Sequence, residues 1–186
     1  NGINNINASE NAGNWLINIR AENLELAELH SFLTTMGIAI SIDELSKGTL
    51  TTNIELQGNQ SGVYQANIKG DINQLSLQAL QGRAASNSVT INIDLQAKQY
   101  KGIWNWHTKN SIEQGEIYYE PLFMEVNDRA IQLDAHGQLN KNETITIKEA
   151  RFVHKDIFEF NFTGQLEKQT NFLITNANLL WNVQDM

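Results

Sequence analysis

Apolar residues recur at every second position along most of the chain. In the clearest run, Val89, Ile91, Ile93 and Leu95 alternate with polar residues. The same period is found at Trp15, Ile17 and Ile19; at Ala66 and Ile68; at Ile131, Leu133 and Ala135; at Phe158, Phe160 and Phe162; and at Leu179, Trp181 and Val183. Such alternation is typical of strands that bury one face and expose the other to water. The pattern predicts roughly ten to twelve strands.

One segment near the N-terminus has the period of a helix instead. Between Asn23 and Gly37 the apolar positions fall three and four residues apart, which places them on one face of a helix. These positions are Leu26, Leu29, Leu33 and Met36. Gly37 stands where a C-terminal cap is expected, and residues 38–48 are expected to form a connector. The helix is predicted to dock on one end of the sheet and to shield its apolar edge.

Small clusters of glycine, asparagine and lysine interrupt the alternating runs. They occur at Gly58-Asn59, Ser61-Gly62, Gly70-Asp71, Lys101-Gly102, Gly115 and Asn140-Lys141-Asn142. These residues favour the backbone angles of tight turns, so each cluster predicts a hairpin or a loop. Pro121 is the single proline, and it is expected at a strand edge or in a loop because it cannot donate a backbone hydrogen bond.

An internal repeat lies near the C-terminus. Residues 133–154 and 160–181 align without a gap at an offset of 27. The shared frame places Gly137 over Gly164 and Leu139 over Leu166. Each copy has the pattern of a strand, a glycine where the strand bends, and a second strand after a polar loop. This is the pattern of a repetitive sheet built from one supersecondary unit.

The composition narrows the classes of function. Charged residues make up only 18% of the 186-residue chain, so uncharged polar residues must provide much of its wetted surface. The formal net charge is -8, and the 13 lysines and arginines form no run, which excludes binding to a nucleic-acid backbone. The absence of cysteine excludes disulfide scaffolds and thiolate metal sites.

Candidate catalytic and metal-binding residues are sparse. The histidines are His30, His107, His136 and His154, and none has a second ligand at a spacing typical of a metal site. We therefore expect no metal ion and no organic cofactor. A carboxylate-rich stretch contains Glu113, Glu116, Glu120, Glu125 and Asp128. It could supply the acid pair of a glycosidase or form a solvated hairpin face, and the second interpretation is favoured, so the chain is not expected to be an enzyme.

Aromatic residues are densest around Trp104 and Trp106. Tyr100 precedes these tryptophans, and Tyr118 and Tyr119 follow them. Three interpretations of this patch stay open: a platform for sugar rings, one wall of an apolar groove, and ordinary core packing.

Short motifs within the alternating runs resemble those of a known family. Leu-Asp-Ala-His-Gly-Gln-Leu at 133–139, Phe-Asn-Phe-Thr-Gly-Gln-Leu at 160–166 and Ile-Lys-Gly-Asp-Ile at 68–72 resemble the strand-Gly-x-Leu units of the AsmA-like proteins, including the TamB and YdbH types, of the Gram-negative envelope. The likeness covers most of the chain after Gly48. It implies a repeating β-groove with an apolar inner face and a polar outer face. The expected fold class is all-β, a long curved antiparallel sheet with one short helix near the N-terminus.

The whole chain, residues 1–186, is expected to be a single β-groove segment of a larger protein. Residues 14–48 would form a strand-helix entry and connector, and residues 49–186 a β meander with the repeat at 133–181. The chain opens at Asn1 and contains no apolar stretch long enough to span a membrane. Any anchor, and any contact with a membrane, is therefore expected outside it.

The resemblance also implies a part in lipid transport across the periplasm. Members of this family, anchored in the inner membrane, conduct phospholipid towards the outer membrane, with acyl chains in the groove and head groups in water. The implied partners are phospholipid acyl chains and other segments of the same larger protein, and nucleic acid is not among them. The groove is expected to be lined by Ile91, Ile93, Leu95, Trp104, Trp106, Leu133, Phe158, Phe160, Phe162, Leu179 and Trp181.

Two other interpretations stay open. A surface rich in asparagine with exposed aromatic residues also fits a carbohydrate-binding or adhesive β module of an exported protein. A closed jelly roll that carries lipopolysaccharide is a third candidate. A groove leaves one apolar face open from end to end, whereas a binding module closes its apolar residues into a core.

Overall fold

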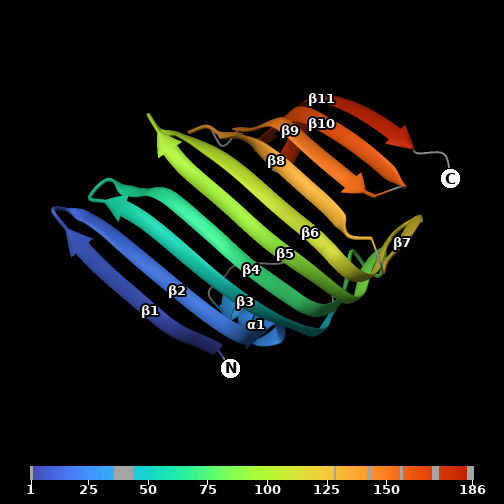
Figure 1. Cartoon of the computed structure of the whole chain (residues 1–186), viewed down its shortest axis with the longest axis horizontal. Helices are drawn as coiled ribbons and strands as arrows, with labels where there is room; N and C mark the ends of the chain where they lie inside the picture. The colour runs from blue at the N-terminus through green and yellow to red at the C-terminus, as the bar shows by residue number, and fades with distance from the viewer. Residues whose placement is uncertain are drawn as a thin grey trace.

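The computed structural model describes residues 2–35, 44–127, 129–141, 144–155, 157–168 and 172–183. Within these ranges the chain forms one antiparallel sheet of 11 strands and one short helix (Figure 1). The elements are β1 (Gly2–Asn11), β2 (Asn14–Glu25), α1 (Leu26–Thr35), β3 (Glu44–Asn59), β4 (Gly62–Ala79), β5 (Ala84–Tyr100), β6 (Ile103–Tyr119), β7 (Leu122–Val126), β8 (Ile131–Leu139), β9 (Thr144–His154), β10 (Phe158–Lys168) and β11 (Phe172–Val183). The predicted fold class is confirmed.

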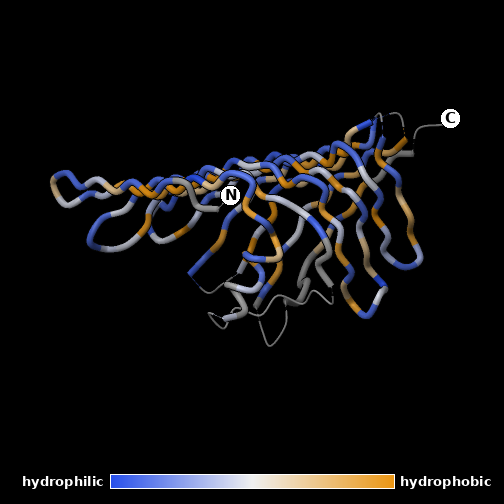
Figure 2. Tube along the Cα trace, turned by 90° about the horizontal axis from the view of Figure 1, so that it is seen from below, coloured by the Kyte–Doolittle hydropathy of each residue, from blue (hydrophilic) through white to orange (hydrophobic). Residues whose placement is uncertain are grey.

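The strands follow one another across the sheet as a meander. Their order is β1-β2-β3-β4-β5-β6-β8-β9-β10-β11, and β7 pairs with β6 outside this path. The long strand β6 pairs with β8 over residues 104–112 and with β7 over residues 115–119. β1 and β11 lie at opposite edges, so the sheet is open (Figure 1). Seen from a second direction, the sheet is bent (Figure 2).

Few side chains are fully buried. Among the described residues, the buried apolar side chains are Ala21, Val89, Val126, Ile131, Ala135 and Ala150. A two-sheet sandwich buries large side chains from both of its inner faces. Here large apolar residues such as Ile91, Ile93 and Leu95 are only half-buried. The residues that the structure describes therefore form an open sheet without the closed core that a sandwich or a jelly roll requires.

Several strands are longer than the turn signals predicted. The turns expected at Asn59 to Gly62 and at Lys101-Gly102 are present, whereas Gly70-Asp71 and Gly115 lie inside β4 and β6. Gly70 is needed for close packing, since a Cβ there would lie 2.7 Å from the Thr51 carbonyl oxygen. A glycine can therefore mark a close approach of two strands instead of a chain reversal.

The N-terminal region also differs from the prediction. β2 continues to Glu25, so α1 begins three residues later than the predicted start at Asn23. β3 begins at Glu44, inside the predicted connector, because Gly48 (φ 144°) gives an irregularity within the strand and does not end it. β1 was not among the predicted elements.

The helix lies behind β3 in the view of Figure 1. It lies against β2 and β3, next to the edge strand β1, and its predicted role in shielding the apolar edge of the sheet stays a prediction. A Cβ at Gly48 would meet Leu26 Cδ1 at 2.7 Å, so Leu26 occupies the space that the missing side chain leaves. Leu29 is half-buried, whereas the Leu33 side chain and Met36 lie outside the described residues.

The C-terminal repeat corresponds to two successive hairpins. Its first copy is β8 with β9, and its second is β10 with β11. The register shifts at Gly137 in the first copy and next to Gly164 in the second, and both glycines stand opposite Ile147 of β9. Within the second copy itself, the register of β10 with β11 shifts between Gln165 and Leu166. That the two hairpins are copies of one repeating unit stays a prediction.

Irregularities in register also occur towards one end of β2, β3, β4, β5 and β6. Residues with positive φ accompany them: Asn23, Gly48, Gln74, Ser88 and Gly115. Such bulges bend a strand and increase its twist. The fully buried side chains Val89 and Val126 lie at this bend, where Gly115 stands opposite Val126.

The bend predicts that alanine destabilises the fold by different amounts at two glycines with similar φ angles. Gly62 (φ 115°) has open space around its missing Cβ, whereas a Cβ on Gly115 (φ 113°) would lie 2.6 Å from Val89 Cα. Gly62→Ala should lower the free energy of unfolding by about 1–2 kcal/mol through backbone strain. Gly115→Ala should lower it by about 1–3 kcal/mol more because of the clash. Urea unfolding measures both, and equal losses would contradict tight packing at the bend.

Candidate functional site

Strand register sorts the side chains onto two faces. Ile91 of β5 stands opposite Ile72 of β4 and Ile112 of β6, and Ile112 stands opposite Ile131 of β8. Residues directly opposite each other point to the same side of a sheet, so these isoleucines form one row. We call the side that holds this row the apolar face. The other side, on which Asp94 lies, is the polar face.

The register places all the predicted groove positions on the apolar face. Paired positions on neighbouring strands connect them across the sheet. Their order is Ile91, Ile93 and Leu95, then Trp104, Trp106 and Leu133, then Phe158, Phe160 and Phe162, and finally Leu179 and Trp181. The same face extends in the other direction, where Leu95 stands in line with Ile68, Ile54, Ile19 and Ile6. The role of these positions in binding lipid stays a prediction.

The apolar face is hollowed where β5, β6, β8 and β9 lie side by side. A groove of about 430 Å³ is lined there by Ile91, Ile93, Leu95, Thr108, Asn110, Ser111, Ile112, Ile131, Leu133 and Phe152. Its volume is within the usual range of small-molecule sites, about 300–1,000 Å³. Among the other predicted positions, those that do not line it are Trp104, Trp106, Phe158, Phe160, Phe162 and Leu179, and the Trp181 side chain lies outside the described part of the structure.

Sequence reasoning missed some residues of this groove. Ile131 begins the alternating run that continues to Leu133, and Phe152 is aligned with Leu179 in the 27-residue repeat. The sequence therefore contained evidence that both residues belong to the apolar face. Ile112 is surrounded by polar residues in the sequence and carried none.

A row of aromatic rings adjoins the groove. Phe152, which lines the groove, stacks on Phe160 with ring centroids 4.4 Å apart and an interplanar angle of 14°. Phe160 in turn lies 6.1 Å from Phe158. Aromatic contacts of this kind add to the stability that burial alone gives. Phe158 and Phe160 therefore lie beside the groove and do not line it.

The aromatic patch predicted around Trp104 is divided in the structure. Trp106 lies over Gly137, where a Cβ would approach its ring to 2.7 Å, and Trp104 stands opposite Leu139. Tyr118 and Tyr119 lie at the other end of β6, roughly 40 Å away at about 3.3 Å per residue. The two tryptophans belong to the apolar face, and the two tyrosines to a separate cluster.

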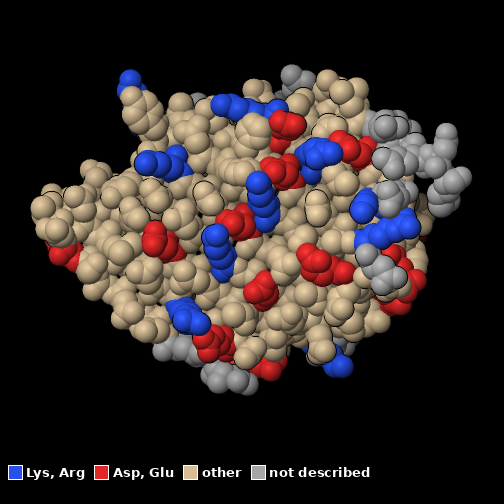
Figure 3. Space-filling model, viewed as in Figure 1, with Lys and Arg blue, Asp and Glu red and all other residues tan. Residues whose placement is uncertain are grey.

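The polar face carries charges of both signs, interspersed over its surface (Figure 3). Lys69 Nζ lies 3.2 Å from Asp94, and Arg151 pairs with Glu159 at 2.7 Å. These groups are exposed to solvent, so each pair contributes little to stability. Their even distribution leaves no large surface of a single charge.

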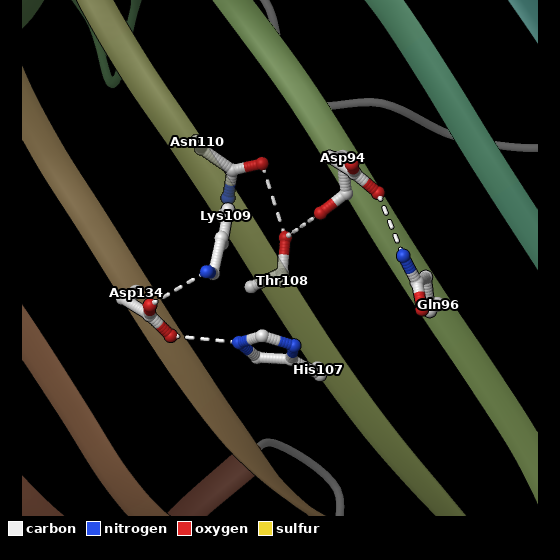
Figure 4. A network of polar contacts seen from close by, with 7 residues as sticks. All are labelled: Asp94, Gln96, His107, Thr108, Lys109, Asn110 and Asp134. Carbon is white, nitrogen blue, oxygen red and sulfur yellow. Dashed lines mark hydrogen bonds and ion pairs between the residues drawn. The ribbon is translucent and has the colours of Figure 1, made fainter.

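Asp134 is a carboxylate of the polar face with two basic partners. It lies between His107 and Lys109 of β6, with Oδ1 at 2.7 Å from His107 Nε2 and Oδ2 at 3.6 Å from Lys109 Nζ (Figure 4). The hydrogen bond from His107 and the two neighbouring charges hold the pKa of Asp134 below its ordinary value. The lowered pKa keeps Asp134 ionised at neutral pH, so it is not a candidate general acid.

Carboxylates of the acidic stretch accept hydrogen bonds from uncharged side chains. Glu113 accepts hydrogen bonds from Asn92 and Ser111, and Glu116 accepts one from Asn87. Asp128, its last member, lies outside the described residues. Among the residues that the structure describes, no three histidine or carboxylate side chains are placed to hold a metal ion.

His154 is the buried titratable group of the apolar face. It is only 5% exposed, it stands opposite Ile131 and Phe158, and its Nδ1 has no hydrogen-bond partner. Burial lowers the pKa of His154, the charge of Arg129 also lowers it, and a hydrogen bond with the Arg129 backbone opposes the shift. The neutral imidazole is therefore the form that the fold favours.

Comparison with protein-family models, with curated proteins and with solved structures finds no match to this chain. Within the described ranges, no helix has the length and apolar character needed to cross a membrane. The groove and the polar face therefore have to be interpreted from their own geometry.

His154 predicts a pH dependence of stability. The unfolded chain binds a proton on this histidine as the pH falls through about 6.5, whereas the folded chain resists protonation until lower pH. The contribution of His154 is therefore complete above that pH and is lost as the pH falls. His154→Phe should reduce the drop in melting temperature between about pH 7.5 and 5.5. The control His136→Phe, at an exposed position, should keep the drop, and an unchanged drop in both variants would contradict this role.

Proposed function

We propose that the apolar face binds the acyl chains of phospholipid, and that the chain is one segment of a periplasmic lipid-transport protein between the inner and outer membranes. The observation that carries this proposal is the open apolar face. It runs from Ile6 of β1 to Leu179 of β11, and within the described residues no second sheet covers it. Ile6 and Leu179 are 61% and 59% exposed.

The physical argument rests on the exposed apolar surface. Soluble domains rarely leave a large continuous apolar surface in water, and such surfaces mark sites of binding. Each methylene that leaves water for this face contributes about 0.8 kcal/mol, so a long acyl chain can be held without an ionic contact. The charged polar face stays in water on the opposite side of the sheet. This division fits a ligand whose chains are apolar and whose head group is solvated.

The edges of the sheet support the proposed link to other segments of a larger protein. The apolar face reaches both edge strands, β1 and β11, where Ile6 stands opposite Ile19 and Leu179 stands opposite Phe162. A neighbouring segment that adds a strand to either edge would lengthen the same face. Acyl chains longer than the apolar face of this one segment could thereby be bound.

Photo-crosslinking tests the proposed function by comparing the two faces of one strand. Phe160 lies on the apolar face of β10, and the next residue, Asn161, lies on the polar face opposite Arg151. A photo-reactive phenylalanine analogue in place of Phe160 should capture phospholipid in cells, and the same analogue in place of Asn161 should not. Mass spectrometry of the adducts identifies the lipid. Equal capture at both positions, or none at either, would sink the proposal.

A second candidate function is the binding of a sugar, and one pocket favours it. A hollow of about 300 Å³ at the β7 end of β6 is lined in part by Tyr118, Phe123, Gln78, Asn87 and Glu116. Tyr118 and Phe123 stand opposite each other, and Asn87 donates a hydrogen bond of 3.0 Å to Glu116. Aromatic faces beside amide and carboxylate groups are the chemistry that a sugar ring requires. This pocket shares no lining residue with the groove.

The sugar site predicts that glycan affinity depends on one particular tyrosine. Tyr118→Ala should weaken glycan binding about tenfold, since it removes the ring face against which the sugar stacks. Tyr100→Ala is the matched control, because Tyr100 is exposed at the opposite end of the strands. A glycan array identifies the ligand, and titration followed by NMR measures its affinity. An array without a hit, or equal losses in both variants, would count against this function.

A further inference from the structure

One strand brings polar side chains into the otherwise apolar groove. Thr108 and Asn110 of β6 both line it, whereas Lys109, which lies between them in the sequence, points to Asp134 on the polar face (Figure 4). Asn110 stands opposite Ile93 of β5 and Leu133 of β8. Its amide group is therefore set between two apolar side chains.

The hydrogen bonds of this pair use the oxygen of Asn110 and leave its nitrogen. Thr108 Oγ1 lies 3.0 Å from the carbonyl oxygen of Asp94 and 3.0 Å from Asn110 Oδ1. The hydroxyl has a single proton, so it donates to one of these two oxygens at a time. Among the described residues, no group accepts a hydrogen bond from Asn110 Nδ2. The groove thus contains an amide N–H donor that is half-buried and available to a ligand.

A plain hydrocarbon is a poor match for this donor. A chain lying over Asn110 would remove water from the N–H groups without replacing the lost hydrogen bond, which is unfavourable. A carbonyl oxygen at the same place would restore that bond. The row formed by Ile91, Ile112 and Ile131 adjoins Asn110 on one side, and Thr108 lies on the other.

We propose that Asn110 determines the specificity of the groove by donating a hydrogen bond to the ester carbonyl of an acyl chain. The alkyl part of the ligand then lies along the isoleucine row, and the ester end lies towards Thr108. The ligand class is acyl-ester lipids, in preference to alkyl-ether lipids of the same length. This inference rests on the proposed lipid-binding function and adds the group that selects the ligand.

Two lysophospholipids with the same head group and chain length test the role of Asn110. One carries its chain through an ester and the other through an ether, so they differ only in the carbonyl. Each is used, below its micelle concentration, to displace a dansyl-labelled fatty acid from the protein. The wild type should bind the ester about three- to tenfold more tightly than the ether, as expected for one hydrogen bond.

Variants assign that preference to Asn110. Asn110→Leu should bind both lipids equally, and Asn110→Asp, which keeps the shape but removes both N–H donors, should also lose the preference for the ester. Asn53→Leu is the control, because Asn53 is an exposed residue of the polar face opposite Lys69, and this variant should keep the preference. Circular dichroism checks that each variant is folded.

The outcomes separate this inference from the function on which it rests. Equal affinity of the wild type for the two lipids, or a preference that survives in both Asn110 variants, would overturn the role of Asn110 and leave the lipid groove standing. Binding of neither lipid to the wild type would overturn both.

Discussion

The structure depends on keeping the side-chain alternation of neighbouring strands in phase. A strand has a side-chain period of two, so a slip of one residue would move its whole apolar set to the opposite face. From β1 to β11 the paired positions keep Ile6, Ile68, Leu95 and Leu179 on one side of the sheet. Since the described part of the chain contains no second sheet packed on this one, backbone pairing between neighbouring strands has to maintain that phase.

Bulges adapt this register to a bent sheet. Residues with positive φ, among them Gly48 and Gly115, occur where one strand has an extra residue against its neighbour. Each extra residue changes the alternation locally, and the strand continues beyond it. The bend gathers Val89 and Val126 into the most buried part of the molecule. The curvature of the sheet and its small core therefore have a common origin.

The alternation of apolar residues was sufficient to predict that the chain is built almost wholly from strands with one apolar face. A period of two survives in the sequence wherever one face is wetted, as in the run from Val89 to Leu95. Strand lengths could not be predicted in the same way, because Gly70 and Gly115 have the same local signal as a turn. What distinguishes them is the close approach of a neighbouring strand, which only the tertiary structure provides.

The groove was predictable in part for the same reason. Ile93 and Leu133 follow from alternation, but the inclusion of Asn110 depends on its register with these two residues on other strands. The division of the aromatic patch likewise depends on β6 being one long strand. Residues that are close in sequence, such as Trp106 and Tyr118, lie far apart when the chain between them is extended.

The meander also determines how the molecule holds together as a whole. Its main contacts between elements are those of sheet neighbours, together with the contacts of α1 with β2 and β3. Cooperativity in such an array passes from each strand to the next, as in repeat proteins, and is not shared through a common centre. The two edges can open without the middle, so amide protons of β1 and β11 should exchange before those of β5 and β6. A ligand that lies across several strands would join units that otherwise fray separately.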